Sequence, residues 1–273
     1  MTIHGNPDRQ SAPGSAGVQN ESMSTILVTG ATGTLGTPTT EQLRVAGHDV
    51  RALSRRTGPG LTTGDLLTGE GIAAALDGVD AVVHLATGRR DVDQARTMIT
   101  VARAAGIAHF LLISIVGIED IPLGYYKGKV EIERMLQDSG LPLTILRATQ
   151  FHDFVDGIFR SQKLSPVVVA PAFSFQPVAV SEVAARLVEL AGSDPAGRVA
   201  DIGGPQQRTA RDLAEAWKRA CGVRRPIWTV KLPGKTFAGY AAGHHLVPGP
   251  AFGKGTFEEY LAGKYGAKPA TPR

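Results

Sequence analysis

The chain has 273 residues, of which 42% are hydrophobic and 20% charged, the composition of a globular protein with a well-buried core. No apolar run approaches the roughly 18 residues of a membrane span. The net charge of +4 comes from scattered basic residues without interleaved aromatics, and the single cysteine, Cys221, excludes an internal disulfide. We therefore expect no nucleic-acid or membrane partner and a reducing, cytoplasmic location.

The chain divides into three predicted parts. Residues 1–23 are polar, lack the apolar segment of a secretory signal, and predict a disordered tail. Apolar runs then alternate with helical patterns as far as residue 150. The predicted strands are Thr25–Thr29, Asp49–Ser54, Ala81–Leu85, Phe110–Ser114 and Leu143–Leu146. The predicted helices cover residues 34–46, 70–77, 91–105 and 125–139.

This alternation is typical of βαβ crossovers, and it predicts an α/β fold with a doubly wound parallel sheet buried on both faces over residues 24–150. Beyond residue 150 the pattern breaks into shorter pieces. Helices are predicted at residues 181–192 and 209–222, joined by connections rich in proline and glycine. Residues 151–273 are therefore expected to form a smaller region packed on the sheet domain.

The first predicted strand leads directly into a glycine-rich loop, in the stretch ILVTGATGTLG. We expect Gly30 to allow the turn, Gly33 to let a pyrophosphate approach the backbone, and Gly36 to let the next helix pack on the strand. Thr34 is the expected helix cap. The spacing G-x-x-G-x-x-G is a variant of the dinucleotide fingerprint, and its place in a βαβ series predicts dinucleotide binding. The expected contacts are Gly30, Thr32, Gly33, Thr34, Leu35 and Gly36.

The end of the second predicted strand indicates which dinucleotide is bound. An NAD site usually has an acidic residue there, about 20 residues past the glycines, to bind the ribose. This chain has Ser54, Arg55 and Arg56 in that place. Arginine suits a 2′-phosphate, whereas a carboxylate would repel it, so we expect NADP(H) to be preferred, with NAD(H) as the alternative.

A second chemical motif lies in GYYKGKVEIERML, where Tyr125 and Lys129 share one helix face one turn apart. An ammonium group stabilises a nearby phenolate, so such a pair can donate or accept a proton. The alternative is a solvated helix face carrying ordinary Lys–Glu pairs. Tyr126 is a rival to Tyr125, since a helix rotates by about 100° per residue.

Together these motifs resemble the atypical short-chain dehydrogenase/reductases, close to the NmrA-like NAD(P)H-binding branch. The supporting stretches are VTGATGTLG, GDL, VVHLA, LLISIVGIE, YYKGKVEIERMLQDSGLPLTILRATQF and FQPVAVSEVA. They run in the family's order from about residue 24 to 190. The resemblance implies a Rossmann-like domain over residues 24–150 and a substrate-binding region over residues 151–273.

The resemblance also implies roles for single residues. Tyr125 and Lys129 match the family's catalytic Tyr-x-x-x-Lys pair, and Lys129 would also bind the cofactor ribose. The catalytic serine position falls on Ile115, so Ser114 is either the third catalytic residue or only a cofactor or backbone contact. The other implied cofactor contacts are Asp65 and Leu66 at the adenine, Leu85, Ala86, Thr87 and Gly88 along the cofactor, and Thr149, Gln150 and Phe151 near the nicotinamide.

The sequence thus favours an NADP(H)-dependent oxidoreductase that transfers hydride to a carbonyl or quinone-like molecule. The incomplete serine position favours the alternative, an NADP(H)-binding redox sensor without turnover. An epimerase or dehydratase with tightly held NAD fits Arg55 and Arg56 less well. The protein is expected to be a monomer or a homodimer. A hydrophobic or aromatic substrate is expected, because aromatic residues are frequent after residue 150. These residues are Phe151, Phe154, Phe159, Phe173 and Phe175.

Four histidines are candidate ligands, but no metal site is expected. His84 lies inside an apolar strand and is expected to be a core residue. His152 follows the strand at Leu143–Leu146, near the expected substrate position. The adjacent His244 and His245 are surrounded by Gly and Pro and are expected in a flexible loop.

Overall fold

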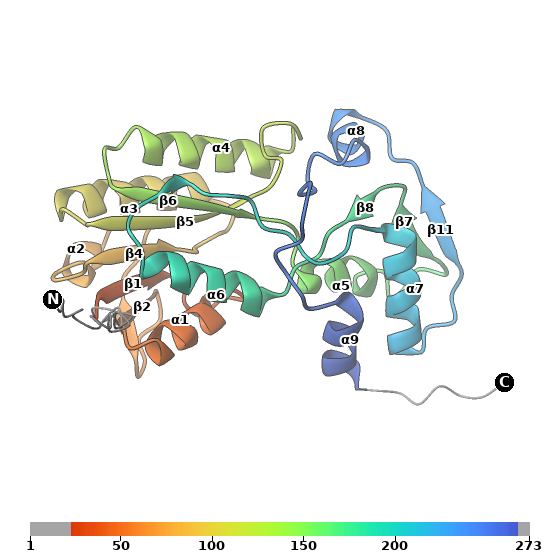
Figure 1. Ribbon diagram of the computed structural model, residues 1–273, viewed down its shortest axis with the longest axis horizontal. Coiled ribbons are helices and arrows are strands. Elements are labelled where there is room, and N and C mark those ends of the chain that lie inside the picture. The colour runs from red at the N-terminus through yellow and green to blue at the C-terminus, as the bar shows by residue number, and fades with distance from the viewer. Residues whose placement is uncertain (1–22, 267–273) are drawn as a thin grey trace, which may run out of the picture.

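The computed structural model describes residues 23–266, and within them seven parallel strands form a central sheet (Figure 1). The strand order is β3-β2-β1-β4-β5-β6-β9. These strands are β1 (Thr25–Thr29), β2 (Asp49–Ser54), β3 (Leu61–Thr63), β4 (Ala81–His84), β5 (His109–Ile115), β6 (Leu143–Ala148) and β9 (Gly197–Arg198). The direction in which strands are added reverses between β1 and β4. The tail predicted at residues 1–23 lies outside the described residues, Met23 excepted.

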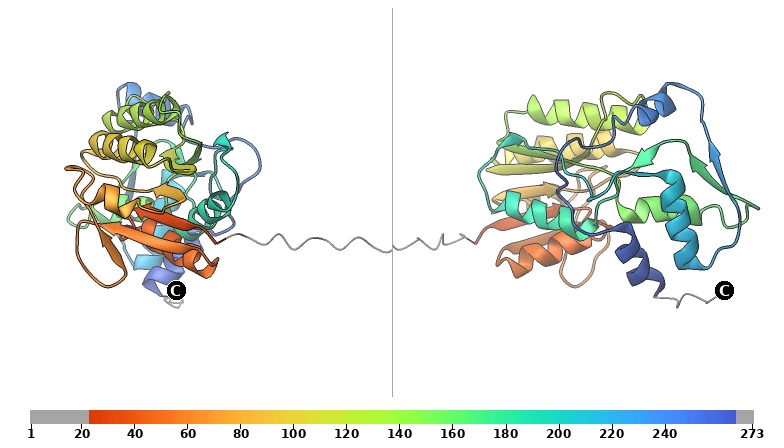
Figure 2. Two further views of the ribbon diagram at one scale, coloured as in Figure 1. Left: turned by 90° about the vertical axis from the view of Figure 1, so that its left-hand side faces the viewer. Right: turned by 45° about the vertical axis from the view of Figure 1, so that its right-hand side comes forward.

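Helices cover both faces of this sheet, as the sequence predicts (Figure 2). One face is covered by α1 (Gly36–Val45) and α6 (Val180–Ala191), and the other by α2 (Ile72–Ala75), α3 (Asp91–Ala104) and α4 (Gly124–Gln137). Successive residues of β1 point to opposite faces of the sheet. Ile26 belongs to the same buried cluster as Leu43 of α1, and Leu27 belongs to the same cluster as Met98 of α3. The Rossmann-like α/β fold is thereby confirmed.

The helix boundaries agree with the predicted ranges to within a few residues, with one clear error. Thr34 is not the helix cap, because α1 begins at Gly36 and Leu35 is the capping residue, without a side-chain hydrogen bond. The helix predicted at residues 70–77 is reduced to the single turn of α2, which follows Gly71 in the left-handed region. No helix within residues 23–266 is long and apolar enough to span a membrane.

The chain beyond residue 151 builds a second layer of structure beside the carboxyl ends of the strands (Figure 1). Its strands form two ribbons, β7 (Val168–Pro171) parallel to β11 (Ile227–Val230), and β8 (Ser174–Phe175) antiparallel to β10 (Arg208–Thr209). The helices here are α5 (His152–Arg160), α7 (Ala210–Cys221), α8 (Lys235–Ala241) and α9 (Phe257–Tyr265). Between these pieces, α6 and β9 return to the central sheet.

His245 is buried, so the flexible loop expected at His244–His245 is wrong. Its Nε2–H donates to the Ser174 carbonyl oxygen, 2.7 Å away, and its ring lies edge-on to Tyr240. A Cβ on Gly117 would lie 2.3 Å from the His244 carbonyl oxygen, so the segment packs closely on the loop after β5. Burial lowers the pKa of His245 and keeps the ring neutral.

Candidate functional site

The predicted site residues follow the carboxyl ends of neighbouring strands. Gly30 follows β1, Leu85 follows β4, Ser114 lies at the end of β5 and Thr149 follows β6. In an open parallel sheet a ligand binds at this edge, where the strand order reverses. The topology therefore brings together segments that are more than 100 residues apart in the chain.

Two glycines of the loop are required by close backbone contacts. Gly30 has a φ of +65°, and a Cβ there would lie 2.8 Å from the amide nitrogen of Ala86. A Cβ on Gly36 would lie 2.0 Å from the carbonyl oxygen of Gly30, nearer than any real Cβ contact. The predicted turn at Gly30 and the predicted close packing at Gly36 are both confirmed.

The loop is open where a phosphate group would approach. Thr32, Gly33 and Thr34 are exposed, and a Cβ on Gly33 would meet only the Gly30 carbonyl oxygen. The first turn of α1 carries no acidic residue, so the positive end of the helix is uncompensated there. These features fit a pyrophosphate.

A cavity of about 610 Å³ opens beside the loop. It lies between α1 and the chain that follows β2, where Arg55 and Arg56 are exposed and the Arg56 amide donates to Ser54 Oγ. No carboxylate pairs with either guanidinium within residues 23–266. The lining residues are Ala31, Thr32, Thr37, Thr40, Glu41, Arg44, Val45, Ala52, Pro59, Gly60 and Leu61.

Thr29, which sequence reasoning does not single out, ties β1 to the loop after β4. Its Oγ1 accepts hydrogen bonds from the backbone N–H groups of Leu85 and Ala86, both at 3.1 Å. The hydroxyl hydrogen then donates to Nδ1 of His84, 3.0 Å away. His84 is a satisfied core histidine, as predicted, and burial lowers its pKa to about 3.

We expect the stability of the fold to fall as the pH drops below about 6.5. Burial lowers the pKa of His84 to about 3 and that of His109 to about 4, from ordinary values of 6.5. Between pH 4 and pH 6.5 the unfolded chain therefore binds more protons than the folded chain. The free energy of unfolding should decrease with falling pH by up to about 1.4 kcal/mol per unit for each histidine. Urea unfolding at pH 7, 6 and 5 measures this slope.

A matched pair of variants assigns the effect. His84→Gln and His109→Gln should each reduce the slope by up to one proton, and the double variant should reduce it by the sum of the two effects. An unchanged slope in His84→Gln would show that this buried ring is not the source.

Tyr125, Thr87, Asp91 and Lys129 form a connected network at the same edge. Lys129 Nζ lies 3.0 Å from Asp91 Oδ2, and both side chains are buried. The Asp91 carboxylate also accepts from the Thr87 hydroxyl, at 3.0 Å, and from the Gly88 backbone N–H. Because the Thr87 hydrogen points to Asp91, the phenol of Tyr125, 2.7 Å away, donates to Thr87.

The structure separates the two adjacent tyrosines. Tyr125 is 42% exposed at the edge of the sheet, and its ring centroid lies 5.5 Å from Lys129 Nζ. Tyr126 is only 5% exposed and accepts a hydrogen bond from the Tyr240 hydroxyl, at 2.9 Å. Burial, reinforced by this bond, raises the pKa of Tyr126. Tyr125 is thus the tyrosine available to a ligand.

Ser114 and Gln150 present buried polar atoms at the same edge. Ser114 Oγ and both amide atoms of Gln150 have no hydrogen-bond partner in the described part of the chain. Such atoms are normally satisfied, so they indicate a ligand group or water near the carboxyl ends of β5 and β6. Thr149 differs, because its hydroxyl donates to the Gln176 carbonyl oxygen at 2.5 Å and holds the loop in place. Phe151 is half-buried and bridges to Val178.

Three predicted cofactor contacts have their side chains in the hydrophobic core. Leu35, Leu66 and Leu85 are buried, so any contact that they make with a ligand is through the backbone. Asp65 is half-buried, and its Oδ1 accepts from the Leu67 amide at 2.8 Å. Asp65 therefore shapes the loop after β3.

Most of the phenylalanines after residue 150 lie either in the core of the C-terminal region or at the surface. Phe159 and Phe175 belong to the core of the C-terminal region, and Phe154 is exposed to solvent. His152 is buried against the rings of Phe257 and Tyr260. Burial lowers its pKa despite several nearby carboxylates. The aromatic or hydrophobic substrate that the sequence predicts therefore draws no support from Phe159 or Phe175, whose side chains are buried in the core.

The fold and the glycine loop define a dinucleotide-binding protein. The model of the NAD(P)H-binding family matches residues 30–194, which hold the glycine loop, the Tyr125 network and α6. The chain belongs to this NAD(P)H-binding family.

Individual relatives agree with this placement. A curated relative from Streptomyces griseus subsp. griseus, (4-alkanoyl-5-oxo-2,5-dihydrofuran-3-yl)methyl phosphate reductase, is 30% identical over 220 residues, 74% of this chain and 75% of that protein. Quinone oxidoreductase 2 of Escherichia coli is 32% identical over 136 residues, about half of each chain (45% and 47%). A solved structure of an NADPH-dependent quinone oxidoreductase from Escherichia coli has a TM-score of 0.75 at 19% identity and covers 88% of this chain and 99% of that one. The structural likeness shows the fold. Membership of the narrower NmrA-like branch stays a prediction.

Proposed function

We propose that the protein is an NADPH-dependent reductase of the short-chain dehydrogenase/reductase type that transfers hydride to a carbonyl or quinone-like small molecule. The observation that carries the proposal is the Tyr125 network, which places an accessible phenol beside a buried lysine at the cofactor edge. The proposed cofactor contacts come from four segments. They are the glycine loop, which includes Thr32, the pair Arg55 and Arg56 after β2, the loop 85–88, and Gln150.

Each side chain of the network has a distinct task. NADPH, when bound, would supply a hydride to the carbonyl carbon of the acceptor. Tyr125 turns its O–H from Thr87 to the acceptor oxygen and donates the proton, so that an aldehyde or ketone becomes an alcohol. With a quinone the same step gives a hydroxydienone, which tautomerises to the hydroquinone. Lys129 stabilises the phenolate left behind, and solvent returns the proton because Tyr125 is open to water.

Asp91 acts as a positioning residue in this scheme. A lysine ammonium buried without a partner would cost several kcal/mol (about 3–5). The Asp91 carboxylate removes this cost and fixes the Lys129 side chain beside the Tyr125 ring. The same carboxylate orients Thr87, which in turn holds the Tyr125 phenol until a substrate replaces it.

Names of relatives support reduction as the reaction. The relatives described above carry the names of a reductase and a quinone oxidoreductase, and a further one is named NAD(P)H azoreductase. All three names describe reduction of small molecules. A solved relative is described as complexed with NADPH, which supports NADPH as the hydride donor here.

We expect Arg55 and Arg56 to discriminate NADPH from NADH. A guanidinium–phosphate contact is worth about 1.5–3 kcal/mol, so the double variant Arg55→Gln/Arg56→Gln should bind NADPH about 10- to 100-fold more weakly and bind NADH unchanged. Calorimetric titration with both dinucleotides measures this.

Arg103→Gln, at an exposed arginine on the last turn of α3, is the matched control for the loss of surface charge. An equal loss of affinity for NADPH and NADH in the double variant would contradict the proposed 2′-phosphate contact.

A second candidate function is an NADP(H) sensor without turnover. The observation that favours it is the Asp91 carboxylate, which balances the charge of Lys129 and so weakens its effect on a phenolate. The absence of a serine at position 115 points the same way.

An acceptor panel separates the two candidates. Consumption of NADPH is followed with quinones, aldehydes and ketones at a saturating concentration of cofactor. A reductase turns over at least one class, whereas a sensor binds NADPH tightly and consumes it with none of them.

A further inference from the structure

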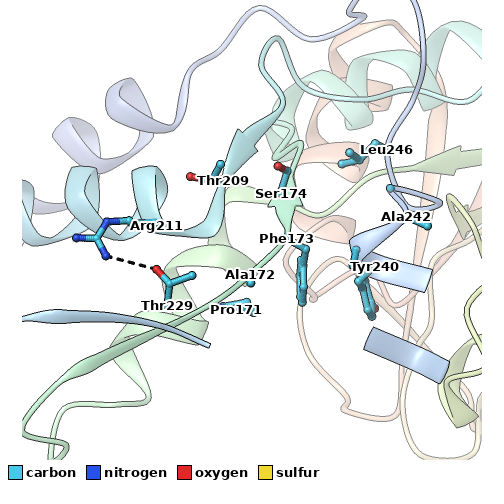
Figure 3. Close-up of a pocket in the computed structure, with 12 residues that line it drawn as sticks. Pro171, Ala172, Phe173, Ser174, Thr209, Arg211, Thr229, Tyr240, Ala242 and Leu246 are labelled. Carbon is cyan, nitrogen blue, oxygen red and sulfur yellow. Dashed lines mark hydrogen bonds between the residues drawn. The ribbon is translucent and has the colours of Figure 1, made fainter. Parts of the chain in front are cut away.

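The C-terminal region contains a cavity of about 540 Å³ where its two ribbons diverge (Figure 3). β7 pairs with β11 as far as Pro171, but from Ser174 the chain pairs with β10 instead. The change of partner strand separates the ribbons, and the end of α8 lines the cavity beside them. The cavity has the volume of a small-molecule site.

One end of the cavity has a preformed aromatic wall. The rings of Phe173 and Tyr240 are stacked, with centroids 5.0 Å apart and planes inclined by 18°. Leu246 and Ala242 extend this apolar surface. The Tyr240 ring is fixed in place because its hydroxyl donates to Tyr126. A rigid wall of this kind favours a flat ligand, since few side chains lose freedom on binding.

The other end carries the guanidinium group of Arg211, whose contacts with the protein are all long. Arg211 of α7 makes only long hydrogen bonds, at 3.4 Å, to Thr229 Oγ1 and the Ile227 carbonyl oxygen. Its ion pair with Glu215, on the same helix, is also long, at 4.0 Å between Nη2 and Oε1, and 53% of the Arg211 side chain is exposed. Figure 3 shows Arg211 and Thr229 at one side of the cavity and the Phe173–Tyr240 wall at the other. A guanidinium in this state favours a carboxylate, sulfonate or phosphate.

We propose that this cavity is a second ligand site, which takes a flat aromatic or conjugated molecule with one anionic group. The ring system lies against Phe173 and Tyr240, and the anion is held by Arg211 and Thr229. The site is separate from the glycine loop and shares no residue with the Tyr125 network. The inference therefore does not depend on hydride transfer and can be tested without cofactor.

Calorimetry with 2-naphthoate and its uncharged analogue 2-naphthol tests the proposal on the full chain. We expect naphthoate to bind about tenfold more tightly than naphthol. Arg211→Gln should remove this preference and leave the affinity for naphthol unchanged, which also shows that the variant is folded. Arg219→Gln, exposed two turns further along α7, makes the same charge change outside the cavity and should have no effect.

Two further measurements test whether naphthoate binds in this cavity. Phe173→Ala should weaken both ligands by about tenfold, because it removes half of the aromatic wall. Saturating NADPH should not displace naphthoate. The proposal is overturned if naphthoate does not bind, if Arg211→Gln and Arg219→Gln behave alike, or if NADPH competes with naphthoate.

Discussion

Tyr125→Phe is expected to lower the rate of acceptor reduction by about 10²- to 10⁴-fold, because the variant retains the ring but has no proton to donate. The dissociation constant for NADPH should not change, since Asp91 still holds Thr87 in place when the phenol hydroxyl is removed. Steady-state kinetics with an acceptor from the panel, together with calorimetric titration, measures both quantities.

Tyr126→Phe is the matched control for this variant. It removes the hydrogen bond from Tyr240, so we expect a loss of roughly 1 kcal/mol in the free energy of unfolding and an unchanged rate. Turnover by Tyr125→Phe at the wild-type rate would refute the proton-donor role. A large rate loss in Tyr126→Phe would mean that the other tyrosine has that role.

Gly36→Ala is expected to abolish measurable NADPH binding. The added methyl group would lie 2.0 Å from the Gly30 carbonyl oxygen, so either the turn or α1 must move. Both carry backbone groups of the pyrophosphate site, and overpacking of this kind also costs about 1–3 kcal/mol of stability. Titration with NADPH and urea unfolding measure the two effects.

Gly157→Ala makes the same substitution where nothing lies within 4 Å of the new Cβ, in the middle of α5. It should leave NADPH binding intact and raise stability by about 0.5–1 kcal/mol, because alanine is the better helix former. If Gly36→Ala behaves like this control, close packing of α1 on the loop is not needed for cofactor binding.

The central sheet can be predicted because its signals are local. Thr25–Thr29 holds three apolar residues in a row, and Asp49–Ser54 holds Val50, Ala52 and Leu53. The structure has both strands at the predicted limits. The prediction that Thr34 caps α1 is wrong, because cap propensity does not determine where this helix begins. The helix begins at Gly36, where the backbone packs closely on the Gly30 carbonyl group.

The C-terminal region could not be predicted in the same way. Strands such as β8 and β10 have two residues each and exist because they pair with one another across more than 30 residues. The Gly and Pro residues around His245 predict a flexible loop. The burial of His245 depends on Ser174 and Tyr240, which no local pattern connects to it.

The sequence predicts which residues of the candidate site share a helix face, but not how they are connected to other elements. The spacing of Tyr125 and Lys129 indicates a shared helix face, and in the structure Lys129 Nζ lies 5.5 Å from the centroid of the Tyr125 ring. Asp91 was missed, although an acidic residue at the start of a predicted helix is a recognisable signal. Its partnership with Lys129 joins two different helices, so only the folded chain reveals that the lysine charge is balanced.

The most direct test of the proposed reaction is the isotope effect on NADPH consumption when both hydrogens at nicotinamide C4 are replaced by deuterium. With the best acceptor from the panel, breaking of the C4–H bond predicts a normal primary isotope effect in single-turnover rates, in the wild type and, at a lower rate, in Tyr125→Phe. Tight binding of NADPH with no consumption on any quinone, aldehyde or ketone would contradict the proposed reductase activity and favour an NADP(H) sensor.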